Sequence, residues 1–195
     1  MSTNTVMPHS ESDYLFFWRP QDTNGWASQW YLSSFTAPLS AAIPHASSTL
    51  HTFPTAEHWM MACKAALFLD TATLELILDE NTNPDTNPKV IKALGRRISP
   101  FDEETWVEHR EEIVYHGSLY KFGQNEELKK TLLETGSLTL VEASPLDRIW
   151  GIGFKGDKAM EKMERWGLNL LGQALMRVRE EFGKQEQGPE VETKL

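Results

Sequence analysis

The sequence predicts an α+β fold, a predominantly helical single domain with a small β-sheet. Helical patterns fill most of the chain from residue 55 to residue 182, whereas strand patterns are short and lie mainly before residue 55. At 195 residues with 40% hydrophobic side chains, the chain can form one domain with a sizeable core. We expect this domain to span 13–182, with flexible segments at 1–12 and 183–195.

The expected strands are short and rich in aromatic or β-branched residues. An aromatic run at 14–19 is stopped by Pro20, and further strands are expected at 29–35 and 49–53. The apolar run 138–143 predicts a late, buried strand.

The expected helices carry start or stop signals. They cover 55–70, 73–80, 87–97, 102–113, 126–135, 157–166 and 170–182. Thr55, Asn87, Asp102 and Asn169 are the expected N-caps, and Gly136 is the expected glycine after a helix end. In the turn before residue 126, Gln124 or Asn125 could cap a helix or contact a base edge, and the cap is favoured.

Composition and charge exclude several classes of protein. The net charge of −9 argues against broad coating of duplex nucleic acid, although a small basic pocket could still hold one or two phosphates. The single cysteine, Cys63, suits a reducing compartment. The sequence has neither a membrane-span pattern nor a signal-peptide pattern, so we expect the cytosol, or the cytosol and the nucleus.

The segment from Pro54 to Ala65 predicts a helix that carries an acid and an amine. Glu57, Met61 and Lys64 fall at i, i+4 and i+7, so they share one face. A rise of about 1.5 Å per residue separates Glu57 from Lys64 by roughly 10 Å, which suits bracketing a small ligand. The opposite face has the spacing of a core stripe. The alternative is an amphipathic helix with two solvated charges.

The segment from Leu140 to Gly153 predicts a strand that runs into a glycine-containing loop. The loop presents Glu142, Asp147 and Trp150, and its glycines permit close approach of the backbone to a ligand. Asp147 could orient a ribose hydroxyl or a water, and Trp150 could stack on a base. Alternatively, Asp147 pairs with Arg148 or caps the next element.

Arginines provide candidate phosphate contacts. Arg96 ends one expected helix, and Trp106 and Arg110 share a face of the next at i, i+4. The planar guanidinium suits phosphate, although surface ion pairing is the common alternative. No phosphate loop, dinucleotide fingerprint, serine-hydrolase elbow or zinc spacing is present, so we expect no cofactor and no metal.

A series of short motifs runs in one continuous order through residues 14–182. They are Phe17-Trp18-Arg19, Ser33-Ser34-Phe35, Thr55-Ala56-Glu57-His58-Trp59-Met60, Lys64-Ala65, Leu94-Gly95-Arg96, Trp106-Val107-Glu108-His109-Arg110, Lys121-Phe122, Leu140-Val141-Glu142-Ala143-Ser144-Pro145, Asp147-Arg148-Ile149-Trp150-Gly151 and Trp166-Gly167-Leu168-Asn169-Leu170-Leu171-Gly172. Together they resemble the NADAR family, named after NAD and ADP-ribose. One departure is Ser34, where many relatives have Asn, and it bears on a ribose or base hydrogen bond.

The resemblance implies an N-glycosidic bond hydrolase. The family includes a bacterial N-glycosidase of phosphoribosylated riboflavin-biosynthesis intermediates and members that resemble hydrolases removing ADP-ribose from guanine bases. We expect ADP-ribosylated guanine as the substrate, in single-stranded DNA or RNA. The riboflavin precursor and a non-catalytic ADP-ribose-binding module are the alternatives. Retention of Glu57 and Lys64 favours catalysis, because a binding module needs neither acid nor amine.

The chemistry assigns roles to the residues named above. Cleavage of a ribosyl C–N bond needs an acid for the leaving nitrogen and a stabiliser for positive charge at C1. The expected catalytic residues are Glu57, Lys64 and Asp147, with Lys64 either a phosphate contact or a nucleophile that forms an imine. The expected substrate-binding residues are Arg19, Ser34, Phe35, Arg96, Trp106, Arg110, Glu142, Trp150 and Gly151.

Overall fold

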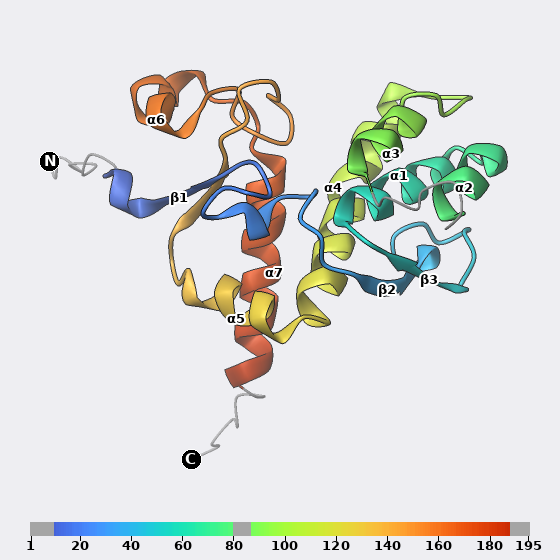
Figure 1. Cartoon of the computed structure of the whole chain (residues 1–195), viewed down its shortest axis with the longest axis horizontal. Coiled ribbons are helices and arrows are strands. Elements are labelled where there is room, and N and C mark those ends of the chain that lie inside the picture. Colours follow the sequence, from blue (N-terminus) through green and yellow to red (C-terminus); the bar gives the residue numbers. More distant parts are fainter. Residues whose placement is uncertain (1–9, 80–86, 188–195) are drawn as a thin grey trace, which may run out of the picture.

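The computed structural model describes residues 10–79 and 87–187 (Figure 1). Its strands are β1 (Tyr14–Phe17), β2 (Phe35–Pro38), β3 (Leu50–Phe53) and β4 (Thr139–Glu142). Its α-helices are α1 (Ala56–Leu67), α2 (Thr71–Leu78), α3 (Pro88–Gly95), α4 (Glu103–Gly123), α5 (Glu126–Glu134), α6 (Gly156–Ala159) and α7 (Leu170–Gln187). The predicted helix-dominated α+β class is confirmed.

The strands form two separate pairs instead of the single small sheet that the sequence suggested. β1 pairs with β4 in parallel, with Phe17 opposite Glu142, and β2 pairs with β3 in antiparallel, with Phe35 opposite Phe53. The β1–β4 pair brings the beginning of the domain against the segment that ends in Glu142. The hydrogen bonds of this pair therefore fix the C-terminal end of β4, where the following loop begins.

Helix α4 lies in the middle of the molecule. It packs against α1 on one side and α7 on the other, while α2, α3 and the β2–β3 pair gather around α1 (Figure 1). Trp59 of α1 is fully buried at this centre, and its indole Nε1 donates to the backbone oxygen of Ile113 at 2.7 Å. Gly117 leaves the room that the indole ring occupies, since an added Cβ would lie 2.3 Å from Trp59 Cδ1.

The expectation of a two-faced α1 is wrong. From Ala56 to Ala66 the helix is buried on all sides, with Lys64 the single half-buried exception. The helix has neighbours all round because α2, α3 and α4 each pack against it. Glu57 is therefore a core carboxyl and not a member of a solvated face.

The expected strand at 29–35 is also wrong. The segment is irregular until Phe35, because its backbone bonds run to the start of α1. The Ser33 N–H donates to the Pro54 carbonyl, and the Glu57 N–H donates to the Gln29 carbonyl. The aromatic composition that suggested a strand serves instead to pack this segment against the helices.

Most of the expected helix starts are confirmed, with differences at three caps. Asn87 and Asp102 cap α3 and α4 through their side chains. Asp70, not residue 73, marks the start of α2. The Thr55 hydroxyl bonds the His58 ring at 2.8 Å instead of the helix backbone. The side chain of Asn169 binds β4, although its carbonyl still accepts the Gln173 N–H of α7.

The turn before α5 is tied to β2 and does not supply the expected side-chain cap. Gln124 forms two hydrogen bonds with the backbone of Thr36, and the Asn125 amide donates to the carbonyls of Ser34 and Lys121. These bonds satisfy a strand edge that would otherwise be open. The turn is therefore structural.

Three helices differ clearly in length from the expectation. Helix α4 runs to Gly123, well beyond the expected end at 113. The helix expected at 157–166 is only the short α6 followed by a 3-10 segment at Met160–Arg165. Helix α7 continues to Gln187, beyond the expected end at 182. Residue 80, the expected end of α2, lies outside the described residues.

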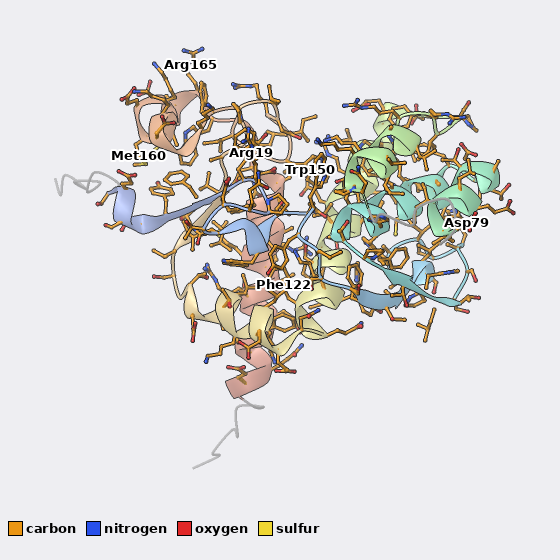
Figure 2. The ribbon with its side chains drawn as sticks, viewed as in Figure 1. Arg19, Asp79, Phe122, Trp150, Met160 and Arg165 are labelled. Atoms are coloured by element: carbon orange, nitrogen blue, oxygen red, sulfur yellow. The ribbon has the colours of Figure 1, made fainter. Side chains whose placement is uncertain are left out.

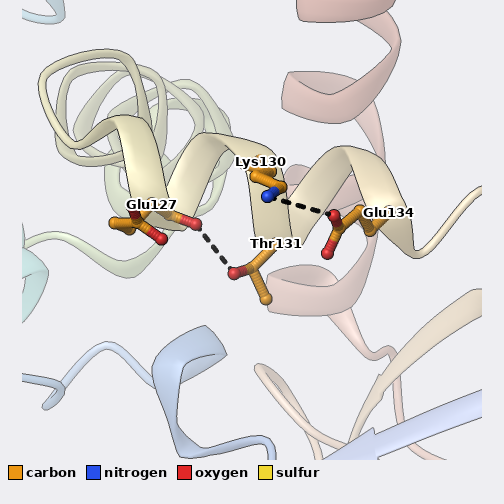
Figure 3. Close-up of polar contacts among 4 residues, drawn as sticks. All are labelled: Glu127, Lys130, Thr131 and Glu134. Carbon is orange, nitrogen blue, oxygen red and sulfur yellow. Dashed lines mark hydrogen bonds and ion pairs between the residues drawn. The ribbon is translucent and has the colours of Figure 1, made fainter.

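Helix α5 shows an ordinary solvent-exposed surface (Figure 3). The Lys130 ammonium lies 3.8 Å from the Glu134 carboxylate, and the Thr131 hydroxyl donates to the Glu127 carbonyl at 2.7 Å (Figure 3). After α5, Gly136 adopts a φ of 55°, as expected for a residue that ends a helix. Across the described ranges, no helix is both long and apolar enough to cross a bilayer.

Candidate active site

The first turn of α1 places the Glu57 carboxyl in the interior. The pKa of Glu57 is raised to about 7, mainly by burial and in smaller part by the negative charge of Asp147. Lys92, a hydrogen bond from Trp30 and Arg96 act in the opposite direction and lower it. Residues from α3, from the position that follows it and from two loops therefore act on one buried acid of α1.

A second acid, Glu142, ends strand β4; the residue is half-buried, and its carboxylate Oε2 is shielded from solvent. Its N–H donates to the Asn169 side-chain oxygen at 2.9 Å, which fixes the backbone at this point. The pKa of Glu142 is raised to about 8, mainly by burial; the charges of Asp147 and Glu57 also raise it, and the charge of Lys92 lowers it. We call Glu57, Glu142, Asp147 and Lys92 the carboxylate cluster, because Asp147 and Lys92 both act electrostatically on Glu57 and on Glu142.

The loop after β4 holds Asp147 beside the two buried acids. One Asp147 oxygen accepts the N–H groups of Ile149 and Trp150, each at 2.8 Å. Gly151 packs on the backbone of Glu142, where an added Cβ would lie 2.6 Å from the carbonyl oxygen. The lack of a side chain at Gly151 thus serves an approach to the protein's own backbone, and a ligand contact at Gly151 stays a prediction.

Asp147 therefore fulfils part of the structural alternative, and its functional role stays a prediction. It caps its own loop, but it does not pair with Arg148, whose guanidinium donates to the Arg165 carbonyl at 2.8 Å. Its charge still acts on both buried acids.

Lys64 lies in the last turn of α1, beside two aromatic rings. Its ammonium donates to the Gly95 carbonyl at 3.3 Å and lies 4.3 Å and 5.2 Å from the ring centres of Phe101 and Trp106. Partial burial lowers the pKa of Lys64, as expected from the sequence. The cations that act on Glu57 come from α3, namely Lys92 and Arg96, and Lys64 is not among them.

Some buried polar atoms have no hydrogen-bond partner within residues 10–79 and 87–187. They belong to Gln29, Ser33, Glu57, Arg110 and Glu142. Buried polar groups in folded proteins are nearly always hydrogen-bonded, so unpartnered groups of this kind point to a bound ligand. Two of the five belong to the carboxylate cluster, and Gln29 and Ser33 belong to the segment bonded to the start of α1.

The predicted substrate-binding residues Arg110, Arg19 and Trp150 differ in how far they are exposed to solvent. Arg110 is buried in α4, one helical turn from the half-buried Trp106, and its Nε is unpartnered. Arg19 is exposed and stacks on Trp18 at 4.1 Å (Figure 2). Trp150 is half-buried and packs against the core, so one part of its ring surface is already covered.

Two predicted substrate contacts are wrong or displaced. Phe35 lies in the core, where its ring contacts those of Phe53 and Trp59. Ser34 is exposed, and its carbonyl accepts from Asn125. The buried hydroxyl in this motif belongs to Ser33, because alternate residues of an extended segment point to opposite sides.

Sequence reasoning missed Gln29, Trp30, Lys92 and Lys121. Gln29 and Trp30 were hidden in a segment interpreted as a strand. Lys92 precedes the predicted phosphate contact Arg96 by four residues, so it lies on the same face of the expected helix, and this spacing could have found it. Lys121 carried a usable signal, since it stands beside Phe122 and four residues after Gly117, on the buried stripe of α4. A lysine on an apolar stripe is rarely buried without a specific role.

Metal ligation has no support in the described part of the chain. There, no group of three or more His, Cys, Asp and Glu side chains is placed to hold a metal ion.

Comparison with known proteins gives a consistent result. The NADAR domain family matches residues 16–183. N-glycosidase R617 of Acanthamoeba polyphaga mimivirus is 41% identical over 156 residues, which are 79% of this chain and 85% of that protein. N-glycosidase Npun_R5314 of Nostoc punctiforme is 34% identical over 140 residues, which are 71% of this chain and 81% of that protein.

A solved structure shares the fold. The NMR structure of the Escherichia coli protein YbiA aligns with a TM-score of 0.65 and 25% identity, over 97% of this chain and 96% of that one. The names of the relatives support a glycosidase of the N-glycosidic class for this chain. The match over nearly the whole described domain shows that the chain belongs to the NADAR family.

Proposed function

We propose that this chain hydrolyses the N-glycosidic bond between ADP-ribose and a guanine base of nucleic acid. The observation that carries the proposal is the carboxylate cluster, in which two buried acids with raised pKa values lie beside a third carboxylate and a lysine. Strongly perturbed acids in one place are typical of active sites.

The cluster can supply the proton that the reaction needs. With pKa values of about 7 and 8, Glu57 is about half protonated at neutral pH and Glu142 is mostly protonated. In the proposed reaction, Glu57 protonates the leaving nitrogen as the bond from C1 breaks, and the oxygen of a water molecule then bonds to C1. Asp147 stabilises the positive charge that develops on the ribose and takes up the proton of the attacking water.

Other residues fit the remainder of the substrate. Lys92, Arg96 and Arg110 provide cationic groups for the two phosphates. The unpartnered groups of Gln29 and Ser33 suit the hydroxyls of a ribose, which both donate and accept hydrogen bonds.

Lys64 has two open roles in this proposal. As a nucleophile, it would exchange into the imine formed when the ribosyl ring opens, release the guanine amine and later be freed by water. As a fixed contact, it would hold Trp106 and the end of α3 in place and leave the water attack to the carboxylate cluster. Its lowered pKa favours the first role and its bond to Gly95 favours the second.

The second candidate substrate is a phosphoribosylated riboflavin precursor. The net charge of −9 favours it, because a small substrate avoids repulsion between the protein and a polyanion. A third candidate function is binding of ADP-ribose without cleavage.

A parallel assay separates the three candidates. Enzyme is incubated with a single-stranded oligonucleotide that carries ADP-ribosylated guanine, and separately with the riboflavin precursor. Mass spectrometry follows the release of ADP-ribose or ribose phosphate. We expect release of ADP-ribose from the oligonucleotide, and loss of this release in Glu57→Gln.

Release from the precursor alone would replace the proposed substrate with the second candidate. If neither substrate is cleaved, calorimetry with ADP-ribose decides whether the chain is a binding module. No heat with millimolar ADP-ribose would contradict both ADP-ribose functions.

A further inference from the structure

Lys121 of α4 is a buried cation outside the carboxylate cluster. The residue is 2% exposed, and its ammonium forms no ion pair with a carboxylate of the described residues. Instead, its ammonium donates to the carbonyls of Trp26 and Ser28, each at 3.0 Å. The cation also lies 5.0 Å from the ring centre of Phe122 and 5.5 Å from that of Tyr31.

These contacts converge on one stretch of backbone, residues 26–31. The two carbonyls stand at the end of the 3-10 turn Gly25–Ala27, so a single ammonium holds the point where the turn leads into the following segment. Burying a lysine carries a large desolvation cost, and burial lowers the pKa of Lys121 to about 7. An apolar side chain of similar length would fill the space without that cost.

The same stretch reaches the proposed acid. The Gln29 carbonyl accepts the Glu57 N–H at 3.1 Å, and the Trp30 side chain donates a hydrogen bond to the Glu57 carboxylate. Trp30 also lies against the cluster's cation, with Lys92 Nζ 5.7 Å from its ring centre. The chain of contacts therefore runs from Lys121, through the backbone of 26–31, to Glu57.

We propose that Lys121 is a positioning residue, whose buried ammonium fixes residues 26–31 so that Trp30 donates to the Glu57 carboxylate. Lys121 does not touch the reacting atoms. Its effect on Glu57 has a defined sign, since the hydrogen bond from Trp30 lowers the pKa of Glu57. Loss of the Lys121 contacts loosens this bond and raises that pKa.

The first test follows the chemical shift of the Trp30 indole N–H by nitrogen-15 NMR between pH 5 and pH 9. Trp30→Phe identifies the signal. In the wild type we expect the signal to follow the titration of Glu57, with a midpoint near its pKa of about 7. In Lys121→Gln, which keeps an N–H donor but lacks the charge, we expect the midpoint to move to higher pH.

Controls separate Glu57 from the groups around it, which are Lys92, Arg96, Asp147, Glu142 and Lys121 itself. Glu57→Gln should abolish the titration at Trp30, and Lys130→Gln, on the exposed face of α5, should leave it unchanged. A midpoint in Lys121→Gln equal to that of the wild type, or a titration that persists in Glu57→Gln, would overturn the proposal.

Lys121→Arg supplies a second test if Lys121→Gln does not fold. It keeps the charge, but the guanidinium is larger and planar, so it does not fit the buried space in which the compact ammonium reaches both carbonyls. We expect the Glu57 N–H to exchange with deuterium faster in Lys121→Arg than in Lys130→Arg. Equal exchange rates in the two variants would contradict the positioning role.

A kinetic arm rests on the proposed function, whereas the NMR and exchange arms do not. We expect Lys121→Gln to lower kcat with little change in KM, and to have no further effect in a Trp30→Phe background. Absence of turnover in the wild type would count against the proposed function alone. Additive effects of the two changes on kcat would count against Lys121 acting through Trp30.

Discussion

At the scale of single residues, the protein withdraws two acids from solvent, Glu57 fully and Glu142 in part. One carboxylate oxygen of each is buried without a hydrogen bond, and both acids are held close to the charge of Asp147. Such an arrangement costs stability, because buried polar groups are normally satisfied. The cost is expected where a substrate supplies the missing partners.

Glu57→Gln tests the proposed acid. Glutamine preserves the volume of the side chain but cannot deliver the proton, so we expect kcat/KM to fall by about 10²–10⁴-fold. Turnover of ADP-ribosylated oligonucleotide is measured alongside thermal unfolding, with Glu134→Gln on the exposed face of α5 as the control. Activity within a few-fold of the wild type would remove Glu57 from the mechanism.

Glu142→Gln tests the second acid through the pH dependence of stability. A carboxyl whose pKa is raised on folding stabilises the protein fully below its unfolded pKa, and this contribution is lost as the pH rises to about 8. The wild type should therefore lose stability relative to Glu142→Gln as the pH rises from 5 to 8, by up to about 1.4 kcal/mol per pH unit. Urea unfolding at several pH values provides the measurement, and parallel curves for the two proteins would contradict the raised pKa.

Lys64→Arg separates the two roles of this lysine. If Lys64 forms an imine, borohydride with substrate should add ADP-ribose, less one water and plus two hydrogens, to a peptide containing Lys64. Lys64→Arg keeps the charge but cannot form the imine, so turnover and adduct should both disappear. Normal turnover in Lys64→Arg with no adduct in the wild type would assign Lys64 to a structural contact and leave direct attack by water.

At the scale of elements, function depends on where β4 ends and the next loop begins. Asn169, at the start of α7, accepts the Glu142 N–H and donates to the Leu140 carbonyl at 2.9 Å. Gly151 packs on the same strand end. The junction of β4, its loop and α7 thus behaves as one unit that fixes Glu142 relative to Asp147.

Asn169→Ala and Asn169→Gly test this junction as a pair. Both remove the two side-chain hydrogen bonds, but only glycine adopts the native φ of 53° without strain. We expect Asn169→Ala to lower the free energy of unfolding by about 1–3 kcal/mol, and Asn169→Gly to lower it by less. Both should lower kcat, because Glu142 loses its support. Wild-type stability and kcat in both variants would show that the junction is not held by Asn169.

At the scale of the whole molecule, the packing of α1 on α4 sets the shape of the site. The carboxylate cluster draws on α1, α3, β4 and the loop after it, and these elements meet only because α4 supports α1 from behind (Figure 1). Close approach of the two helices depends on Gly117, which faces the fully buried Trp59.

Gly117→Ala should therefore be costly even though alanine favours helices. The added Cβ would lie 2.3 Å from a buried ring that has no room to move, so we expect a loss of about 1–3 kcal/mol or more. Gly183→Ala in α7 is the matched control, since nothing lies within 4 Å of its Cβ position. We expect that change to be neutral or to stabilise by up to about 1 kcal/mol. Equal unfolding temperatures for the two variants would contradict tight α1–α4 packing.

The sequence by itself determined the helical character of the chain, because caps and periodicity act over a few residues. Asn87 and Asp102 cap the helices that they were expected to cap, and Gly136 ends α5. The motifs around Glu57 and Asp147 likewise identified the family. The proposed catalytic roles remain predictions.

Only the tertiary structure decided which groups surround each acid. Lys92 acts on Glu57 and Glu142, whereas Lys64, on the same helix as Glu57, contacts Phe101 and Trp106. Helical spacing places residues along one axis but says nothing about what packs against each face. The surroundings of a buried charge are set by contacts between segments far apart in the sequence, such as β1 with β4 and α1 with α3, and these contacts have no local signature.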